Sequence, residues 1–229
     1  MIFYMPGMRR DYFEPKVVKW LIIINVVVFI IEIAYPPVIN ALALVPYDIL
    51  QGKSIWTIIT HMFLHAGVLH IFLNMYALFI FGPECEKEFG REKFLLIYFL
   101  SGIFGALLHI LLTPFKYAPA VGASGAVFGI MAAYAVLYPK RKLMIFMFVG
   151  FLILPAWVLL LFFFLIETLL GLIAYADAVA HLAHVGGMMF GAIYTYFYKK
   201  KKKEEKPFIL PSTVVYYEAS EEEHSYDYW

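Results

Sequence analysis

The sequence predicts an all-α integral membrane protein of about six helices. Of its 229 residues, 63% are hydrophobic and only 15% are charged, whereas soluble domains are about 45–50% apolar and about 25% charged. Six apolar segments are each long enough to cross, or nearly cross, a hydrocarbon core of about 30 Å at about 1.5 Å per helical residue. A chain of this size cannot bury so much apolar surface in one soluble core, so we expect lipid to be its main solvent.

The six segments follow one another along most of the chain. In order they are Val17–Tyr35, Gly67–Gly82, Phe94–Leu112, Ser124–Tyr138, Ala156–Ala174 and Val179–Tyr198. The first is longer than the hydrophobic region of a signal peptide, which spans about 7–15 residues, and no clear cleavage site follows it, so we expect a retained span. The fourth is short, and we expect its helix to start below the membrane surface.

The basic residues predict the orientation of the spans. They gather in four clusters, at Arg9–Lys19, Lys87–Lys93, Lys140–Lys142 and Lys199–Lys203, and six spans put all four on one side. Positive clusters favour the cytoplasmic side, so both termini are expected there. The predicted organisation is a cytoplasmic N-terminal segment over 1–16, a six-helix membrane domain over 17–198 and a polar cytoplasmic tail over 199–229.

Two apolar stretches do not fit a simple up-and-down bundle. Residues 143–174 form an apolar run divided by Gly150 and Pro155, too long for one upright helix and too short for two with a turn. We therefore expect Leu143–Leu154 to lie on the surface or to fold back before the fifth span. The connection Pro36–Ala66 is also apolar, and because irregular backbone cannot face lipid, it should pack on the bundle or form short interfacial helices.

Other features restrict the class of protein. The single Cys85 excludes an internal disulfide and a multi-cysteine metal site. The lysine run Lys199–Lys203 directly follows an apolar helix, so a membrane flank explains it and no nucleic-acid partner is expected. No cofactor is expected either, and the partner that these features predict is the lipid bilayer.

One candidate nucleophile opens the fourth span. The run Gly122-Ala123-Ser124-Gly125 follows two prolines and begins an apolar helix. A serine at a helix start is more often a cap than a nucleophile. The position also suits chemistry, because free N–H groups and the positive end of the helix dipole would stabilise an oxyanion beside Ser124.

A candidate base, His184, lies in the first turns of the sixth span. Small residues recur at four-residue spacing on both spans: Gly125, Gly129 and Ala133 on one, Gly187 and Gly191 on the other. Such faces let helix backbones approach closely, so spans four and six should touch and bring Ser124 within hydrogen-bond reach of His184. The alternative is that the glycines serve packing alone and the histidines cap a helix.

A third polar group lies on and before the second span. His70 and Asn74 are four residues apart, on one helical face, and both can donate hydrogen bonds to an oxyanion. His61 with His65, and His181 with His184, have spacings that also suit metal ligands. No HExxH pattern accompanies them, so we predict no metal, with a metal site as the alternative.

At this point the residues resemble the rhomboid family of intramembrane serine proteases. Gly122-Ala-Ser124-Gly125 is similar to the GxSG motif of the family, and His184 in Ala-His-Val-Gly-Gly is similar to its catalytic histidine. The stretch from His65 through His70 to Asn74 resembles its second-helix pattern, and Glu86 with Gly90 resembles its ExxxG turn. The resemblance covers the chain except the tail.

The resemblance implies a rhomboid-like six-helix bundle with a Ser124–His184 dyad rather than a triad. It also implies an oxyanion site made by His70, Asn74 and the Ser124 backbone N–H, lined by His65, Gly122 and Phe128, in a hydrated cavity open to the outer side. The expected reaction is endopeptidase cleavage of single-span membrane proteins. Two positions depart from the pattern: Trp56-Thr57 stands for a Trp-Arg pair, and Phe128 stands where many members have Tyr.

Two acidic residues, Asp177 and Glu167, precede His184 in the sequence. Asp177 precedes His184 by seven residues, about 10 Å along a helix, so we expect it to cap the sixth span rather than contact the imidazole. Glu167 lies within the fifth span, where it either pairs with a polar neighbour or is protonated. The sequence names no partner for it.

Two other functions stay open beside the protease. A rhomboid-like protein without activity would bind and escort membrane clients, although such proteins lose the serine or the histidine and this chain keeps both. A proton-coupled transporter would use the intramembrane histidines as a relay.

Overall fold

The computed structural model describes residues 13–147, 150–173 and 180–204. Its elements in chain order are α1 (Lys16–Ala34), α2 (Val38–Leu42), α3 (Pro46–Leu50), α4 (Thr57–Thr60), the 3₁₀ turn η1 (His61–Phe63), α5 (Val68–Phe89), α6 (Arg91–Leu112), α7 (Ser124–Leu137), β1 (Lys142–Met147), β2 (Gly150–Pro155), α8 (Ala156–Ile173) and α9 (His181–Glu204). Asp177, most of the predicted N-terminal segment and most of the predicted tail lie outside the described residues.

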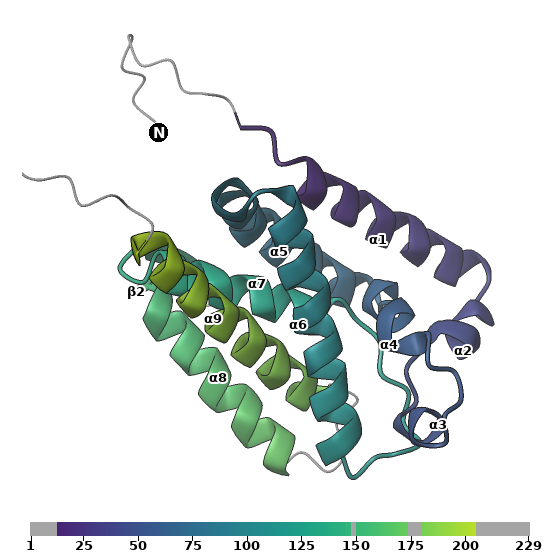
Figure 1. Cartoon of the computed structure of the whole chain (residues 1–229). Coiled ribbons are helices and arrows are strands. Elements are labelled where there is room, and N and C mark those ends of the chain that lie inside the picture. The colour runs from purple at the N-terminus through teal and green to yellow at the C-terminus, as the bar shows by residue number, and fades with distance from the viewer. Residues whose placement is uncertain (1–12, 148–149, 174–179, 205–229) are drawn as a thin grey trace, which may run out of the picture.

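Each of the six predicted segments contains a helix among its described residues, and the long helices form a bundle around α7 (Figure 1). Helix α7 packs against α9, α6, α5 and α8, while α9 also packs along α6. Helices α1 and α8 lie at opposite edges of the bundle: α1 contacts α5 and α6, and α8 contacts α9 and α7 (Figure 1). The short helix that carries Ser124 is therefore the most enclosed element of the fold.

Four of the described helices, α1, α5, α6 and α8, are long and apolar enough to cross a membrane by length and composition. Helix α7 has only 14 residues, in agreement with the short fourth segment expected from the sequence. Helix α9 has 24 residues but includes the lysine run near its end. The structure thus supports a membrane bundle.

The long helices carry their apolar side chains outward. On α1, Trp20, Ile30 and Ile33 are each about 60% exposed, while the polar Asn25 and Glu32 are buried. Water-soluble helices show the opposite distribution, because exposed apolar surface is unfavourable in water. Lipid is the solvent that suits this surface.

The apolar stretch before α8 is a β-hairpin, a two-stranded addition to a fold whose other described elements are helical. Strands β1 and β2 pair antiparallel, with Leu143 opposite Leu154 and Met147 opposite Gly150. The expected fold-back is confirmed, but it takes the form of a sheet. Pairing of two strands satisfies backbone groups that a lone extended segment would leave open, and β-branched and aromatic residues favour it.

The connection between α1 and α5 forms short helices packed on the bundle, as predicted. Helix α4 lies against α6, and η1 lies against α1 and α7. Leu44 exchanges two backbone hydrogen bonds with Ala120 in the segment that leads to Ser124. The carboxylate of Glu32 on α1 accepts the backbone N–H of His65 at 3.1 and 3.2 Å. These contacts tie the α1–α5 connection to the approach to α7.

The turn between α5 and α6 uses Glu86 and Gly90. The buried Glu86 carboxylate accepts the Val17 and Val18 N–H groups at 3.1 and 2.9 Å, so it caps the first turn of α1 from another helix. Gly90 ends α5 with φ 77°, a left-handed conformation that favours glycine. The motif similar to ExxxG therefore joins three helices.

Candidate active site

The seam between α7 and α9 brings two backbones into contact. A Cβ at Gly187 would overlap the carbonyl oxygen of Gly125, and one at Gly191 would overlap that of Gly129. The predicted contact between the two small-residue faces is confirmed. Glycines at these positions allow the close helix approach that holds the start of α7 beside the start of α9.

Ser124 and His184 meet at the end of this seam. The Ser124 Oγ lies 2.7 Å from His184 Nε2, so the predicted hydrogen-bond reach is confirmed. Ala123, not Ser124, occupies the N-cap position of α7, and no side-chain cap hydrogen bond is found there. The interpretation of Ser124 as a helix cap is therefore wrong, and its hydroxyl is directed to an imidazole.

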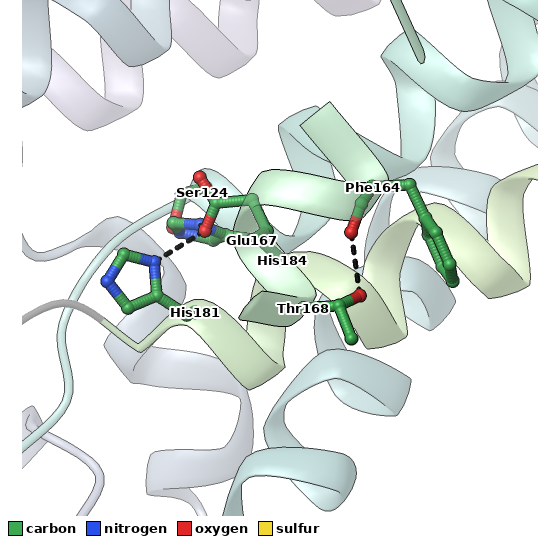
Figure 2. Close-up of polar contacts among 6 residues, drawn as sticks. All are labelled: Ser124, Phe164, Glu167, Thr168, His181 and His184. Carbon is green, nitrogen blue, oxygen red and sulfur yellow. Dashed lines mark hydrogen bonds and ion pairs between the residues drawn. The ribbon is translucent and has the colours of Figure 1, made fainter. Parts of the chain in front are cut away.

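A carboxylate contacts the other ring nitrogen of His184. Glu167 Oε2 lies 2.8 Å from His184 Nδ1 and 2.6 Å from His181 Nδ1 (Figure 2). Glu167 therefore pairs with polar neighbours, one of the two alternatives left open from the sequence. The expectation that His181 lies away from the imidazole was wrong, and the catalytic dyad stays a prediction. The rings of His181 and His184 lie 6.1 Å apart and share one carboxylate oxygen.

This arrangement determines which ring nitrogens carry protons. An ionised carboxylate accepts hydrogen bonds and cannot donate, so when Glu167 is ionised each Nδ1 that contacts its Oε2 carries hydrogen. The Nε2 atom of neutral His184 is then left with a lone pair, and it lies 2.7 Å from the Ser124 hydroxyl. His184 is thus held in the tautomer that can accept a proton from Ser124.

The same three side chains have the chemistry of metal ligands. The ligand atoms of Glu167, His181 and His184 all lie within 4.8 Å of one another. Two ligands of a tetrahedral zinc ion with bonds of about 2.0–2.1 Å lie about 3.3 Å apart. The O···N distances of 2.6 and 2.8 Å are shorter and match hydrogen bonds.

His70 lies beside the loop that precedes Ser124. A Cβ at Gly122 would lie 2.8 Å from His70 Cε1, 3.0 Å from its Nε2 and 3.4 Å from Ser124 Oγ, and Gly122 has φ +136°. The position therefore requires glycine for both space and conformation. The His70 Nδ1 accepts the Ala66 N–H at 3.1 Å, which leaves Nε2 on the side of Ser124.

Asn74 and His65 are buried behind His70. The Asn74 amide donates to the His70 carbonyl oxygen at 2.9 Å, a bond within α5 that uses one of its two hydrogens. The rings of His65 and His70 lie 5.2 Å apart. Burial, aided by the nearby His70, lowers the pKa of His65 to about 4, so this imidazole is neutral at pH 7.

Phe128 packs on the imidazole of His184. The two rings are stacked, with centroids 4.5 Å apart, and Phe128 also contacts Phe163 on α8 at 5.6 Å. The expected packing of an aromatic on the histidine is confirmed. Phe128 thus joins α7, α8 and α9 at the site.

A small cavity of about 10 Å³ lies on the side of Ser124 toward α6. His61, His109 and Gly122 line it together with Ser124. This volume is at the lower limit for one water molecule. Burial lowers the pKa of His61 to about 4, so the cavity is polar but carries no charge from this residue at pH 7.

Sequence reasoning missed the Glu167 contact. The signal was present, because a glutamate inside an apolar helix is costly and needs a partner. Which partner it finds depends on the rotation of α8 relative to α9, and residue spacing does not give that rotation. His109 was also missed, since it lies in the last turn of α6, away from any motif.

The fold and the site together define a helical membrane protein with a serine and a histidine in contact at the start of a short helix. A family model of the Rhomboid domain matches residues 52–201. The chain therefore belongs to the Rhomboid family, and with its apolar helices it is a membrane protein.

Curated relatives agree with this assignment. The chain is 35% identical over 150 residues to "RHOMBOID-like protein 6, mitochondrial" of Arabidopsis thaliana, covering 62% of this chain and 43% of the relative. It is 34% identical over 137 residues to "Rhomboid-like protease 3" of Toxoplasma gondii, covering 57% and 50%. It is also 36% identical over 83 residues to "Inactive RHOMBOID-like protein 8" of Arabidopsis thaliana, covering 36% and 23%. The chain thus spans half or less of the length of these relatives.

Proposed function

We propose that this chain is an intramembrane serine endopeptidase, with Ser124 as nucleophile and His184 as general base. The observation that carries the proposal is the 2.7 Å contact between Ser124 Oγ and His184 Nε2 at the start of α7. Membership of a family that includes named proteases supports it. The substrates that fit are single-span membrane proteins, cleaved in or near the membrane-spanning segment.

The chemistry follows from the contacts. Ser124 Oγ attacks the scissile carbonyl carbon while its proton passes to His184 Nε2, which then protonates the leaving amine. A water molecule, deprotonated by the same nitrogen, hydrolyses the acyl-enzyme and restores Ser124. The contacts of His184 with an ionised Glu167 and with Ser124 favour the tautomer that this sequence of steps requires.

The oxyanion that forms in the first step needs donors. We assign this role to His70, Asn74 and the backbone N–H of Ser124. The closeness of the His70 ring to Gly122 and Ser124 supports His70. One N–H of the Asn74 amide stays free of the bond to its own helix, which supports Asn74. The positive end of the α7 dipole adds to the same effect.

The orientation is part of the proposal. Six spans, with α7 short and α9 ending in the lysine run, place the basic clusters on one side. Both termini are then cytoplasmic, and the Ser124 end of α7 faces the outer side.

Labelling with a serine-directed fluorophosphonate in detergent tests the proposal. We expect wild-type protein to form a covalent adduct at Ser124, and both Ser124→Ala and His184→Ala to lose it while keeping the thermal stability of the wild type. Labelling of wild type no greater than that of Ser124→Ala would overturn the proposal.

The second candidate is a client-binding protein without protease activity. The similarity to an "Inactive RHOMBOID-like protein" supports it. In that case wild type and Ser124→Ala would bind the same single-span proteins and neither would react with the fluorophosphonate. The intact Ser124–His184 contact favours the protease.

A further inference from the structure

Glu167 occupies an unusual place for an acidic residue. It lies in the apolar helix α8, whose buried residues are Ala156 and Leu159. An ionised side chain in such a helix is costly. Yet its side chain is only 12% exposed and turns toward α9. The imidazoles of His181 and His184 provide the hydrogen bonds that compensate this cost.

We propose that Glu167 is the positioning residue of His184, so that the site works as a Ser124–His184–Glu167 triad whose carboxylate is supplied by α8. This inference rests on the proposed protease function and deepens it. Two contacts carry it: Ser124 Oγ lies 2.7 Å from His184 Nε2, and Glu167 Oε2 lies 2.8 Å from His184 Nδ1.

The carboxylate acts through the imidazole and does not itself take up a proton. When Ser124 attacks, its proton moves to Nε2, and the imidazolium that results keeps its Nδ1–H bonded to Glu167 Oε2. The negative carboxylate stabilises this positive ring. The proton on Nε2 then goes to the leaving amine, and Nδ1–H stays in place throughout.

His181 has a supporting position in this arrangement. Its Nδ1 donates to the same Oε2 at 2.6 Å, which keeps the carboxylate beside His184 when α8 is packed on α9. Helix α8 lies at the edge of the bundle (Figure 1), so the triad is complete only while this edge helix is docked. Docking of α8 and assembly of the site are therefore one event.

The test measures kcat and KM across pH for cleavage of a detergent-solubilised single-span substrate. It compares wild type with Glu167→Gln and Glu167→Ala. Glutamine keeps the size and one acceptor oxygen but removes the charge. We expect kcat to fall on the order of 10²-fold, less than the ~10⁴-fold loss for a buried triad aspartate because Glu167 is shared with His181. KM should change little, because Glu167 acts on the reaction through the His184 imidazole. The acidic limb of the pH–rate profile should move to lower pH, because the neutral side chain no longer favours the imidazolium.

Thr168→Ala is the matched control. Thr168 is adjacent to Glu167, and its Oγ1 bonds the Phe164 carbonyl within α8 (Figure 2). We expect this variant to keep the wild-type kcat and pH profile. Equal thermal stability of the Glu167 variants and wild type shows that loss of activity is not loss of folding.

The outcomes separate this inference from the protease proposal. If wild type cleaves and labels while Glu167→Gln keeps its kcat, or loses kcat with an unmoved acidic limb, the positioning role is wrong and the protease stands. If wild type shows neither cleavage nor Ser124-dependent labelling, the protease proposal fails and the triad fails with it.

Discussion

The seam between α7 and α9 differs from the packing of α8 in how it fixes side chains. At the seam, Gly187 meets the backbone of Gly125 directly, so the starts of both helices are held by main-chain contact. Helix α8 meets the bundle through side chains, including Phe163 and the carboxylate of Glu167. The Ser124–His184 contact therefore rests on the rigid part of the site, and the Glu167 contact on the part that is easier to move.

The largest effect is expected from widening the seam. In Gly187→Ala the new Cβ overlaps the Gly125 carbonyl oxygen, so α7 and α9 must separate. We expect a loss of about 1–3 kcal/mol in stability, as for other overpacked cores, and loss of measurable cleavage because Ser124 moves from His184. Thermal unfolding and substrate cleavage in detergent measure the two effects.

Gly171→Ala on α8 is the matched control for this change. Its Cβ would meet the flexible side chain of Leu182, at 3.0 Å from Cδ2, rather than backbone. We expect near-normal stability and cleavage. Equal losses in the two variants would contradict the distinction between a backbone seam and a side-chain contact.

A smaller effect is expected from Phe128, which contacts both regions. Phe128→Leu removes the stacking on His184 and the contact with Phe163. An aromatic pair contributes about 0.5–1.5 kcal/mol, so we expect about a tenfold fall in kcat/KM. The same change at the exposed Phe79 on α5 should leave cleavage unchanged. An unaffected Phe128→Leu enzyme would mean that the stacking does not orient the imidazole.

The same distinction explains what the sequence could predict. The six helices follow from apolar segment lengths, and the α7–α9 seam follows from glycines at four-residue spacing, so the Ser124–His184 contact was predictable. The pairing of β1 with β2 could not be predicted, because a continuous apolar run has no periodicity that separates strand from helix. The contact between Glu167 and His184 could not be predicted either, because side-chain packing sets the rotation of α8 relative to α9.

His70 shows an intermediate case. Its spacing to Asn74 predicted a shared helical face, and the structure adds that its ring requires glycine at position 122. The bond from Asn74 to the His70 carbonyl could not be predicted, since an amide can rotate to several partners. Pattern alone thus identifies which residues share a face but not every bond that they make.

Removal of metal ions is expected to have no effect on the rate of cleavage. If Glu167 acts as a hydrogen-bond acceptor for His181 and His184, a chelator such as EDTA should leave cleavage and fluorophosphonate labelling unaltered. A zinc ion at these side chains would occupy Nδ1 of His184, and its removal would change the rate. Loss of activity in EDTA that Zn²⁺ restores, in wild type but not in Glu167→Gln, would show that the carboxylate binds metal. Because the O···N distances of 2.6 and 2.8 Å leave too little room between these ligand atoms for such an ion, we expect the insensitive result.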